Sequence, residues 1–224
     1  MIITIDGPTA SGKTTIARML AQKLGFYYLS SGLLFRGLAY YLVHDFFYTQ
    51  EQIANPREQD IIKALDPRNF VYLYDQQQGE QLIVNGKNIT DELRGQAISQ
   101  YASILGTNMC VRAALAQLQH HIAQNHDLVA EGRDMGSAIF PHAQIKFFLT
   151  ASLEVRAARW QKDQNAKGKK ISLEEARKEI QTRDERDQGR AVAPLCIPDG
   201  ALIIDDSEMP QQHVVQEMIQ QIKA

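Results

Sequence analysis

A glycine-rich segment near the start of the chain constrains the fold more than any other feature. The segment reads IITIDGPTASGKTT over residues 2–15, and Gly7, Gly12, Lys13 and Thr14 match the pattern G-x-x-x-x-G-K-[ST]. An apolar, β-branched run precedes the pattern, and a helical spacing of apolar residues follows it. Strand, loop and helix therefore occur in the order that a phosphate-binding P-loop requires.

Each residue type in this loop has a chemical reason. Glycines let the backbone N–H groups turn toward phosphate oxygens, and the helix N-terminus adds partial positive charge. We expect Lys13 to reach the β- and γ-phosphates, and the Thr14 hydroxyl to contact a Mg²⁺ ion that bridges them. A glycine-rich turn that merely starts a helix is the alternative, but its lysine would face the positive end of its own helix. The candidate nucleotide-binding residues form one stretch: Gly7, Pro8, Thr9, Ala10, Ser11, Gly12, Lys13, Thr14 and Thr15.

Later apolar runs resemble the first strand, at residues 2–5. Residues 128–131, 145–149 and 201–205 are short runs separated by helical patterns, and residues 26–29 form a plausible fifth strand. Such runs are typical of parallel strands that are buried on both faces. The sequence therefore predicts an α/β fold with a doubly wound parallel sheet flanked by helices, whose ligands lie at the carboxyl ends of the strands.

The character of the sequence changes between residues 66 and 90. The runs FVYLY and QLIVNGKNIT read as antiparallel strands, and Asn85-Gly86 is typical of a tight hairpin turn. We interpret residues 60–100 as a small antiparallel insertion.

A second interruption is polar and lysine-rich, QKDQNAKGKKIS, over residues 161–172. It is either a solvated loop between helices or part of a mobile lid, which phosphoryl transfer often needs to exclude water. With a lid over about residues 156–172, the whole chain, residues 1–224, is expected to form a single domain.

Composition limits the remaining possibilities. The 224 residues are 44% apolar and 22% charged, which is enough for a full core. A net charge of −2 gives no general attraction to nucleic acid. The sequence has no run of 18 apolar residues and no secretory signal, so we expect a cytoplasmic protein without membrane partners. Cys110 and Cys196 lack metal-site spacing and are expected to be ordinary buried thiols, and a monomer is the default.

Two groups of charged residues stand out. Arg183, Asp187 and Arg190 have the spacing of one helix face, provided that the helix continues that far. On their own they are equally typical of a salt-bridged, solvated surface. Arg133 and Asp134, however, directly follow a predicted strand, at the ligand-facing edge of an open α/β sheet. Arginine at such a place is well suited to clamp a second phosphate.

These segments together carry a resemblance to a family. The N-terminal P-loop, SSGLLFRG, EGRDMG and RDERDQGRAVAPL are similar to the bacterial cytidylate kinases, over residues 2 to about 205. The resemblance implies transfer of the ATP γ-phosphate to CMP or dCMP, with ATP and Mg²⁺ bound at the P-loop. It also implies that the antiparallel insertion is a nucleotide-binding region.

The resemblance further implies roles for individual residues. The acceptor phosphate would be held by Arg36, Arg133 and Arg190, and the ribose by Arg183 and Asp187. The cytosine edge would be lined by Ser103, Arg112 and Asp134, and Ser31 would lie close to the acceptor nucleotide. Arg156 and Arg159 are either lid residues that close on the ATP phosphates or ordinary helix-surface charges. The implied catalytic residues are Lys13, Arg133, Arg190 and Asp134.

Three positions depart from the family pattern. Ser30 stands where the family usually has Asp, and Phe35 where it often has Tyr, which puts fine acceptor affinity in doubt. Thr14 replaces a common Gly and brings the loop closer to the general P-loop pattern.

Other classes of protein fit less well. The base-reading motifs of a GTPase do not occur in the sequence. An ATPase remains an alternative because Glu131 ends a predicted strand, but hydrolysis needs fewer arginines than this chain provides. Another P-loop small-molecule kinase, for UMP, dTMP or shikimate, is the nearest rival.

Overall fold

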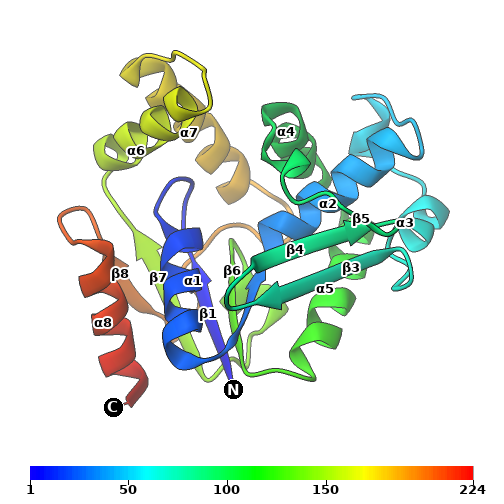
Figure 1. The fold of residues 1–224 in the computed structure, drawn as a ribbon. Helices are drawn as coiled ribbons and strands as arrows, with labels where there is room; N and C mark the ends of the chain where they lie inside the picture. The colour runs from blue at the N-terminus through cyan, green and yellow to red at the C-terminus, as the bar shows by residue number, and fades with distance from the viewer. Residues whose placement is uncertain (224) are drawn as a thin grey trace. The chain divides into compact units, whose positions relative to one another are not determined.

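The structure of this chain is a computed structural model that describes residues 1–223, with two compact units (Figure 1). Unit 1 comprises Met1–Leu24 and Val129–Ala224, and unit 2 comprises Gly25–Leu128.

A five-stranded sheet has the strand order β2-β6-β1-β7-β8. Its strands are β1 (Ile2–Asp6), β2 (Tyr27–Ser30), β6 (Leu128–Gly132), β7 (Ile145–Thr150) and β8 (Leu202–Asp205). Pairing of β1 with β7 and of β7 with β8 is parallel. The predicted parallel sheet and its five strands are therefore confirmed.

The sheet is buried at its centre and open at one edge. Ile3 and Ile5 of β1 and Phe147 of β7 have no exposed surface. In contrast, Leu202 and Ile203 of β8 are 40% and 58% exposed. The expectation that every strand is buried on both faces is wrong for β8, whereas β2 at the other edge of the sheet is mostly buried, so edge position alone does not expose a strand.

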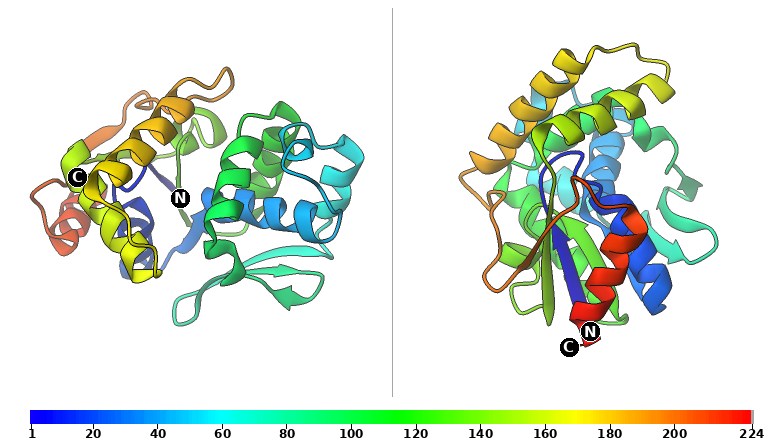
Figure 2. Two further views of the ribbon diagram at one scale, coloured as in Figure 1. Left: turned by 90° about the horizontal axis from the view of Figure 1, so that it is seen from above. Right: turned by 90° about the vertical axis from the view of Figure 1, so that its left-hand side faces the viewer.

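The helices of unit 1 form two pairs. Helix α1 (Lys13–Leu24) packs beside α8 (Gln211–Lys223), while α6 (Leu153–Ala166) and α7 (Leu173–Gln188) form a helical hairpin (Figure 2). A short turn of π-type helix, η3 (Met135–Ile139), follows β6. The start of the chain and the end of α8 lie at the same end of unit 1, where β1 begins (Figure 2).

A serine cap begins each helix of the α6–α7 hairpin. Ser152 accepts from the Val155 amide at the start of α6, and Ser172 forms a reciprocal capping box with Glu175 at the start of α7. The connecting loop covers only residues 167–172. It is shorter than the predicted polar loop, because α6 continues through the first part of that segment.

Unit 2 is built on α2 and a small antiparallel sheet. Its elements are α2 (Ser31–His44), η1 (Gln52–Ala54), α3 (Glu58–Ala64), β3 (Phe70–Asp75), β4 (Gly79–Val84), β5 (Lys87–Asn88), η2 (Glu92–Arg94), α4 (Gln96–Leu105) and α5 (Met109–Ala123). The sheet order is β3-β4-β5. Asn85 and Gly86 have φ angles of 49° and 77° at the turn between β4 and β5, which confirms the predicted hairpin turn.

Gly37 lets α2 approach the small sheet. A Cβ atom at this position would lie 1.9 Å from Leu82 Cδ2 of β4 and 3.1 Å from the Phe70 ring. Only a residue without a side chain therefore permits this packing.

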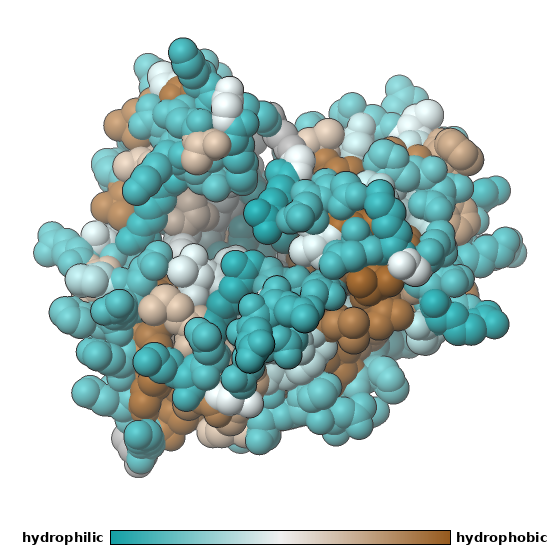
Figure 3. Space-filling model, in the orientation of Figure 1, coloured by the Kyte–Doolittle hydropathy of each residue, from teal (hydrophilic) through white to brown (hydrophobic). Residues whose placement is uncertain are grey.

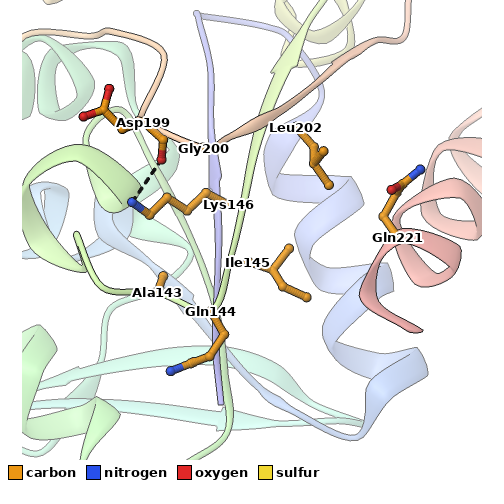
Figure 4. A pocket seen from close by; sticks show the side chains of 8 residues that line it. All are labelled: Ala143, Gln144, Ile145, Lys146, Asp199, Gly200, Leu202 and Gln221. Carbon is orange, nitrogen blue, oxygen red and sulfur yellow. Dashed lines mark hydrogen bonds between the residues drawn. The ribbon is translucent and has the colours of Figure 1, made fainter. Parts of the chain in front are cut away.

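The outer surface is mainly hydrophilic on the face in Figure 3, with separate apolar groups. Both Cys110 and Cys196 are exposed, so the expectation of buried thiols is wrong. Among the described residues, no helix combines the length and the apolar character needed to cross a membrane. A hollow of about 390 Å³ lies at the amino-terminal ends of β7 and β8, where Lys146 Nζ donates to the Asp199 carbonyl at 3.2 Å (Figure 4). The P-loop follows the opposite end of β1, so this hollow is not the phosphate site.

Candidate phosphate-transfer site

The P-loop connects β1 to α1, as the sequence predicts, and its curvature depends on glycine. A Cβ atom on Gly7 would lie 2.0 Å from the Leu149 carbonyl oxygen, so no other residue fits there. Lys13 closes the loop, because its Nζ atom donates to the Pro8 carbonyl at 2.7 Å and lies 3.4 Å from Ser11 Oγ. The loop is therefore already curled around the lysine.

The electrostatic surroundings of Lys13 favour an anion. Its side chain is buried, and burial, together with the positive charges of Arg133 and Arg183, holds the lysine pKa well below its usual value. The carboxylates of Glu131 and Asp187 act in the opposite direction. A phosphate beside Lys13 would relieve the repulsion among these cations.

Thr14 and Glu131 bring two oxygen atoms together at the start of α1. Thr14 Oγ1 donates to Glu131 Oε1 at 3.3 Å, and Glu131 is buried at the end of β6. A hydroxyl and a carboxylate are the oxygen ligands that Mg²⁺ accepts, so these residues fit the predicted metal. From the sequence, Glu131 was considered only as a possible ATPase acid. Its position at the end of a buried strand was the feature that could have identified it as a metal ligand.

Thr9 is the centre of a hydrogen-bond cluster that joins the P-loop to the helical hairpin. Its amide donates to Asp184 Oδ1 at 2.9 Å, and its carbonyl accepts from Arg156 Nη1 at 3.1 Å. Arg156 also pairs with the Asp184 carboxylate. Arg133, the residue directly after β6, donates from its Nη2 atom to Thr9 Oγ1 at 3.2 Å. Sequence reasoning missed Asp184, because a single acid on a highly charged helix gives no signal.

Asp187 lies between two of the predicted phosphate-binding arginines. Its carboxylate accepts from Arg133 Nε at 2.8 Å and also pairs with Arg190. Although burial alone would raise the pKa of Asp187, the charges of Arg133 and Arg190 hold it below its usual value. Arg190 meets Asp187, but not along one helix face, which is the arrangement that the sequence spacing predicts. Because α7 ends at Gln188, Arg190 reaches Asp187 from the loop beyond it.

Arg159 occupies a separate position beside the loop. Its guanidinium donates to both oxygens of Asp206, at 2.9 and 3.1 Å. A Cβ atom on Gly12 would lie 3.8 Å from Arg159 Nη1, so the ion pair stands next to the P-loop. Both predicted lid arginines, Arg156 and Arg159, therefore start from α6 and contact groups at or beside the loop.

Apart from Asp134, which lies in unit 1 two residues after β6, the remaining candidates lie in unit 2. Ser30 caps α2 by accepting from the Leu33 amide at 3.3 Å, a role that a serine performs well where the family usually has Asp. The Arg112 guanidinium lies 5.9 Å from the centre of the Phe35 ring and donates to the Gly106 carbonyl at 3.1 Å. Phe35 thus supports Arg112 with its ring face. The other unit 2 candidates are the buried residues Ser31 and Ser103, and Arg36 on α2.

The fold and this site define a class of protein. A P-loop between the first strand and the first helix of a parallel α/β sheet, with a buried lysine and several arginines beside it, is the architecture of a P-loop kinase. A solved structure of an uncharacterised protein from Eubacterium ventriosum has a related fold, with a TM-score of 0.55 at 12% identity, and the match covers 100% of this chain and 99% of that one.

Comparison with protein families identifies the particular kind of kinase. The Cytidylate kinase family model matches residues 3–224. A cytidylate kinase from Polynucleobacter necessarius is 38% identical over 218 residues, covering 97% of this chain and 96% of its own length. One from Caldanaerobacter subterraneus is 35% identical over 221 residues, covering 99% and 94%. The chain belongs to the cytidylate kinase family, and it is an ATP-dependent nucleoside monophosphate kinase.

Proposed function

We propose that this kinase transfers the γ-phosphate of ATP to CMP or dCMP, and that the residues described above carry out the transfer. The observation that supports the proposal is the cationic cluster beside the P-loop. Arg133 and Arg183 stand close enough to Lys13 to lower its pKa, and Arg190 joins Arg133 through Asp187. A kinase whose acceptor is itself phosphorylated must neutralise two anionic substrates at one place.

On the donor side, the P-loop backbone and Lys13 bind the ATP phosphates. Thr14 and Glu131 would hold Mg²⁺, which, when bound, neutralises charge on the β- and γ-phosphates. Arg156 and Arg159 lie at the loop, and we propose that they close on the donor phosphates. To do so, each guanidinium must exchange at least part of its present pairing, with Asp184 and Asp206 respectively, for a phosphate oxygen.

On the acceptor side, Arg133 and Arg190 hold the α-phosphate of CMP and orient it for in-line attack. The acceptor oxygen is already an anion near neutral pH, so catalysis is mainly positioning and charge neutralisation and needs no strong general base. We propose that Asp134 reads the cytosine amino group, and that Arg183 and Asp187 contact the ribose. Because Asp187 already pairs with both arginines, it also orients them.

The residues of unit 2 complete the list of proposed acceptor contacts: Ser31, Arg36, Ser103 and Arg112. We propose that the chain is a single kinase domain, with residues 60–100 as a nucleotide-binding insertion and about residues 156–172 as a lid. The cytoplasmic location and the monomeric state remain predictions from the sequence.

A panel of acceptors tests the proposed function. The protein is mixed with ATP and Mg²⁺ and, in separate reactions, with CMP, dCMP, UMP, dTMP or shikimate, and ADP release is followed. We expect rapid turnover with CMP or dCMP and slow ATP hydrolysis when no acceptor is present, because the site must close to exclude water. Preferred turnover of UMP, dTMP or shikimate would reassign the substrate. Fast ATP hydrolysis that CMP does not change would indicate an ATPase.

A further inference from the structure

Asp6 is a buried carboxylate at the end of β1 to which the proposed mechanism gives no role. Its side chain has no exposed surface. Its Oδ1 atom accepts a hydrogen bond from the Met135 amide at 2.7 Å, and its Oδ2 atom accepts one from the Gly136 amide at 2.7 Å. Both oxygens of one carboxylate are therefore used to hold two consecutive backbone groups 129 and 130 positions away in the sequence.

The two amides begin the short turn η3, directly after Arg133 and Asp134. The Asp134 carbonyl accepts from the amides of Ala138 and Ile139 at 2.9 and 3.1 Å, so the first amides of the turn need a partner outside it. Asp6 supplies that partner. Because hydrogen bonds to a carboxylate are short and directional, they fix where the turn starts.

Asp6 is also the residue directly before Gly7, where the P-loop begins. One side chain thus connects the start of the donor loop to the segment that carries the acceptor-binding residues. The same place is crowded, since a Cβ atom on Gly136 would lie 2.8 Å from Thr4 Oγ1. The turn can approach β1 this closely only because residue 136 is a glycine.

We propose that Asp6 is a positioning residue for base selection: it holds the backbone of the turn so that Asp134 is aimed at the cytosine edge. This inference rests on the proposed function and adds a residue to it. The charged groups that act on Asp6 are Asp134, from the turn, and Lys13, from α1. Asn at position 6 can still accept one of the two hydrogen bonds, but its NH₂ group faces the other amide.

The test compares Asp6→Asn with a control variant that also disturbs the buried core next to Asp6. Ile5→Val removes one methylene from the neighbouring, fully buried position on β1 and touches neither amide of the turn. We measure kcat/KM for CMP and for UMP in the full-length protein. Asp6→Asn is expected to lower the CMP to UMP ratio at least about fivefold, since a misplaced Asp134 discriminates less. Ile5→Val should leave the ratio within about twofold of wild type.

Amide hydrogen exchange supplies a second readout that needs no substrate. In the wild-type protein the Met135 and Gly136 amides should exchange at least about a hundredfold more slowly than free amides, and at least one should exchange faster in Asp6→Asn. Rapid exchange of both amides in the wild type would overturn the proposal, even if the variant does not fold. An unchanged CMP to UMP ratio in a folded variant would do the same. Failure of the proposed function would appear separately, as a wild-type protein that phosphorylates neither pyrimidine nucleotide.

Discussion

Asp187 accepts a hydrogen bond from Arg133 at 2.8 Å, although the two residues are 54 positions apart in the sequence. The same carboxylate pairs with Arg190. One acid on α7 therefore gathers two arginines that the proposed mechanism needs at a single phosphate group. In exchange, the arginines keep the carboxylate ionised inside the protein.

Asp187 should stabilise the fold at neutral pH but not in acid. Because the pKa of Asp187 is lowered in the folded protein, its contribution is complete above the unfolded pKa of about 4 and is lost as the pH falls through the lower, folded value. Asp187→Asn should cost about 3 kcal/mol at pH 7, since it leaves two guanidinium groups without their shared anion. Urea unfolding at pH 7 and at pH 3 measures the difference, which should shrink in acid.

Asp91→Asn serves as the exposed control for this prediction. Asp91 pairs with Arg94, but its side chain is 89% exposed, so the substitution should cost no more than about 0.5 kcal/mol at either pH. Equal costs for the two variants at pH 7 would contradict the role assigned to Asp187.

Asp6 should show the opposite pH dependence. Burial raises its pKa to about 7, against the effect of the two amide hydrogen bonds, so the folded protein holds a proton that the unfolded chain releases near pH 4. Stability should therefore fall as the pH rises from about 4 to 7 and then level off. Relative to Asp6→Asn, the wild type should lose up to about 4 kcal/mol over this range. If urea unfolding at several pH values gives a constant difference, Asp6 ionises at its ordinary pKa.

Lys13→Ala should abolish most of the activity without unfolding the protein. In the proposed mechanism the lysine stabilises negative charge on the transferred phosphate, and removal of such a group typically lowers kcat by about a hundredfold or more. Lys23→Ala is the matched control, because Lys23 is an exposed lysine in the last turn of the same helix. The rates of ADP release and the circular dichroism spectra of both variants check the prediction. Near-normal kcat in Lys13→Ala would remove the P-loop lysine from the mechanism.

Asp134→Asn should relax the choice of base. Cytosine offers an amino donor where uracil offers a carbonyl acceptor, so a carboxylate favours the first and repels the second, whereas an amide can turn either way. We expect the ratio of kcat/KM for CMP over UMP to narrow by at least about tenfold. Should Asp134 only orient Arg133, both substrates would lose activity in parallel and the ratio would stay as in the wild type.

The buried ion pair between α6 and α7 should matter for ATP, whereas the exposed pair between the same helices should not. Arg156 and Asp184 are each 11% exposed and both hold the backbone of Thr9, so Asp184→Asn should raise the KM for ATP several-fold and cost about 3 kcal/mol of stability.

Glu154→Gln is the control, because Glu154 pairs with Arg177 across the same hairpin at 3.8 Å with both side chains exposed. Glu154→Gln should change the free energy of unfolding by no more than about 0.5 kcal/mol, and the KM for ATP by no more than the corresponding factor of about two. Should the two variants behave alike in KM for ATP and in melting temperature, Asp184 would have no special connection to the P-loop.

Local signals in the sequence determined the elements of this protein and the location of its loop. The G-x-x-x-x-G-K-[ST] pattern placed Lys13 at the start of a helix, apolar runs located five strands, and Asn85-Gly86 located a hairpin turn. Each depends on neighbours within a few residues, because propensity, periodicity and turn geometry are short-range properties. For the same reason the motif order pointed to a P-loop kinase before any long-range contact was known.

The partners of the charged groups were decided only by the tertiary structure. Asp6 and Asp184 carried no sequence signal, yet each holds backbone groups more than a hundred positions away. The burial of Lys13, the end of α7 before Arg190 and the exposure of Leu202 and Ile203 also depend on which elements pack together. Charge interactions extend over several ångströms of space rather than along the chain, and burial sets their strength. Sequence spacing therefore named the arginines, whereas the fold determined which carboxylate each one meets.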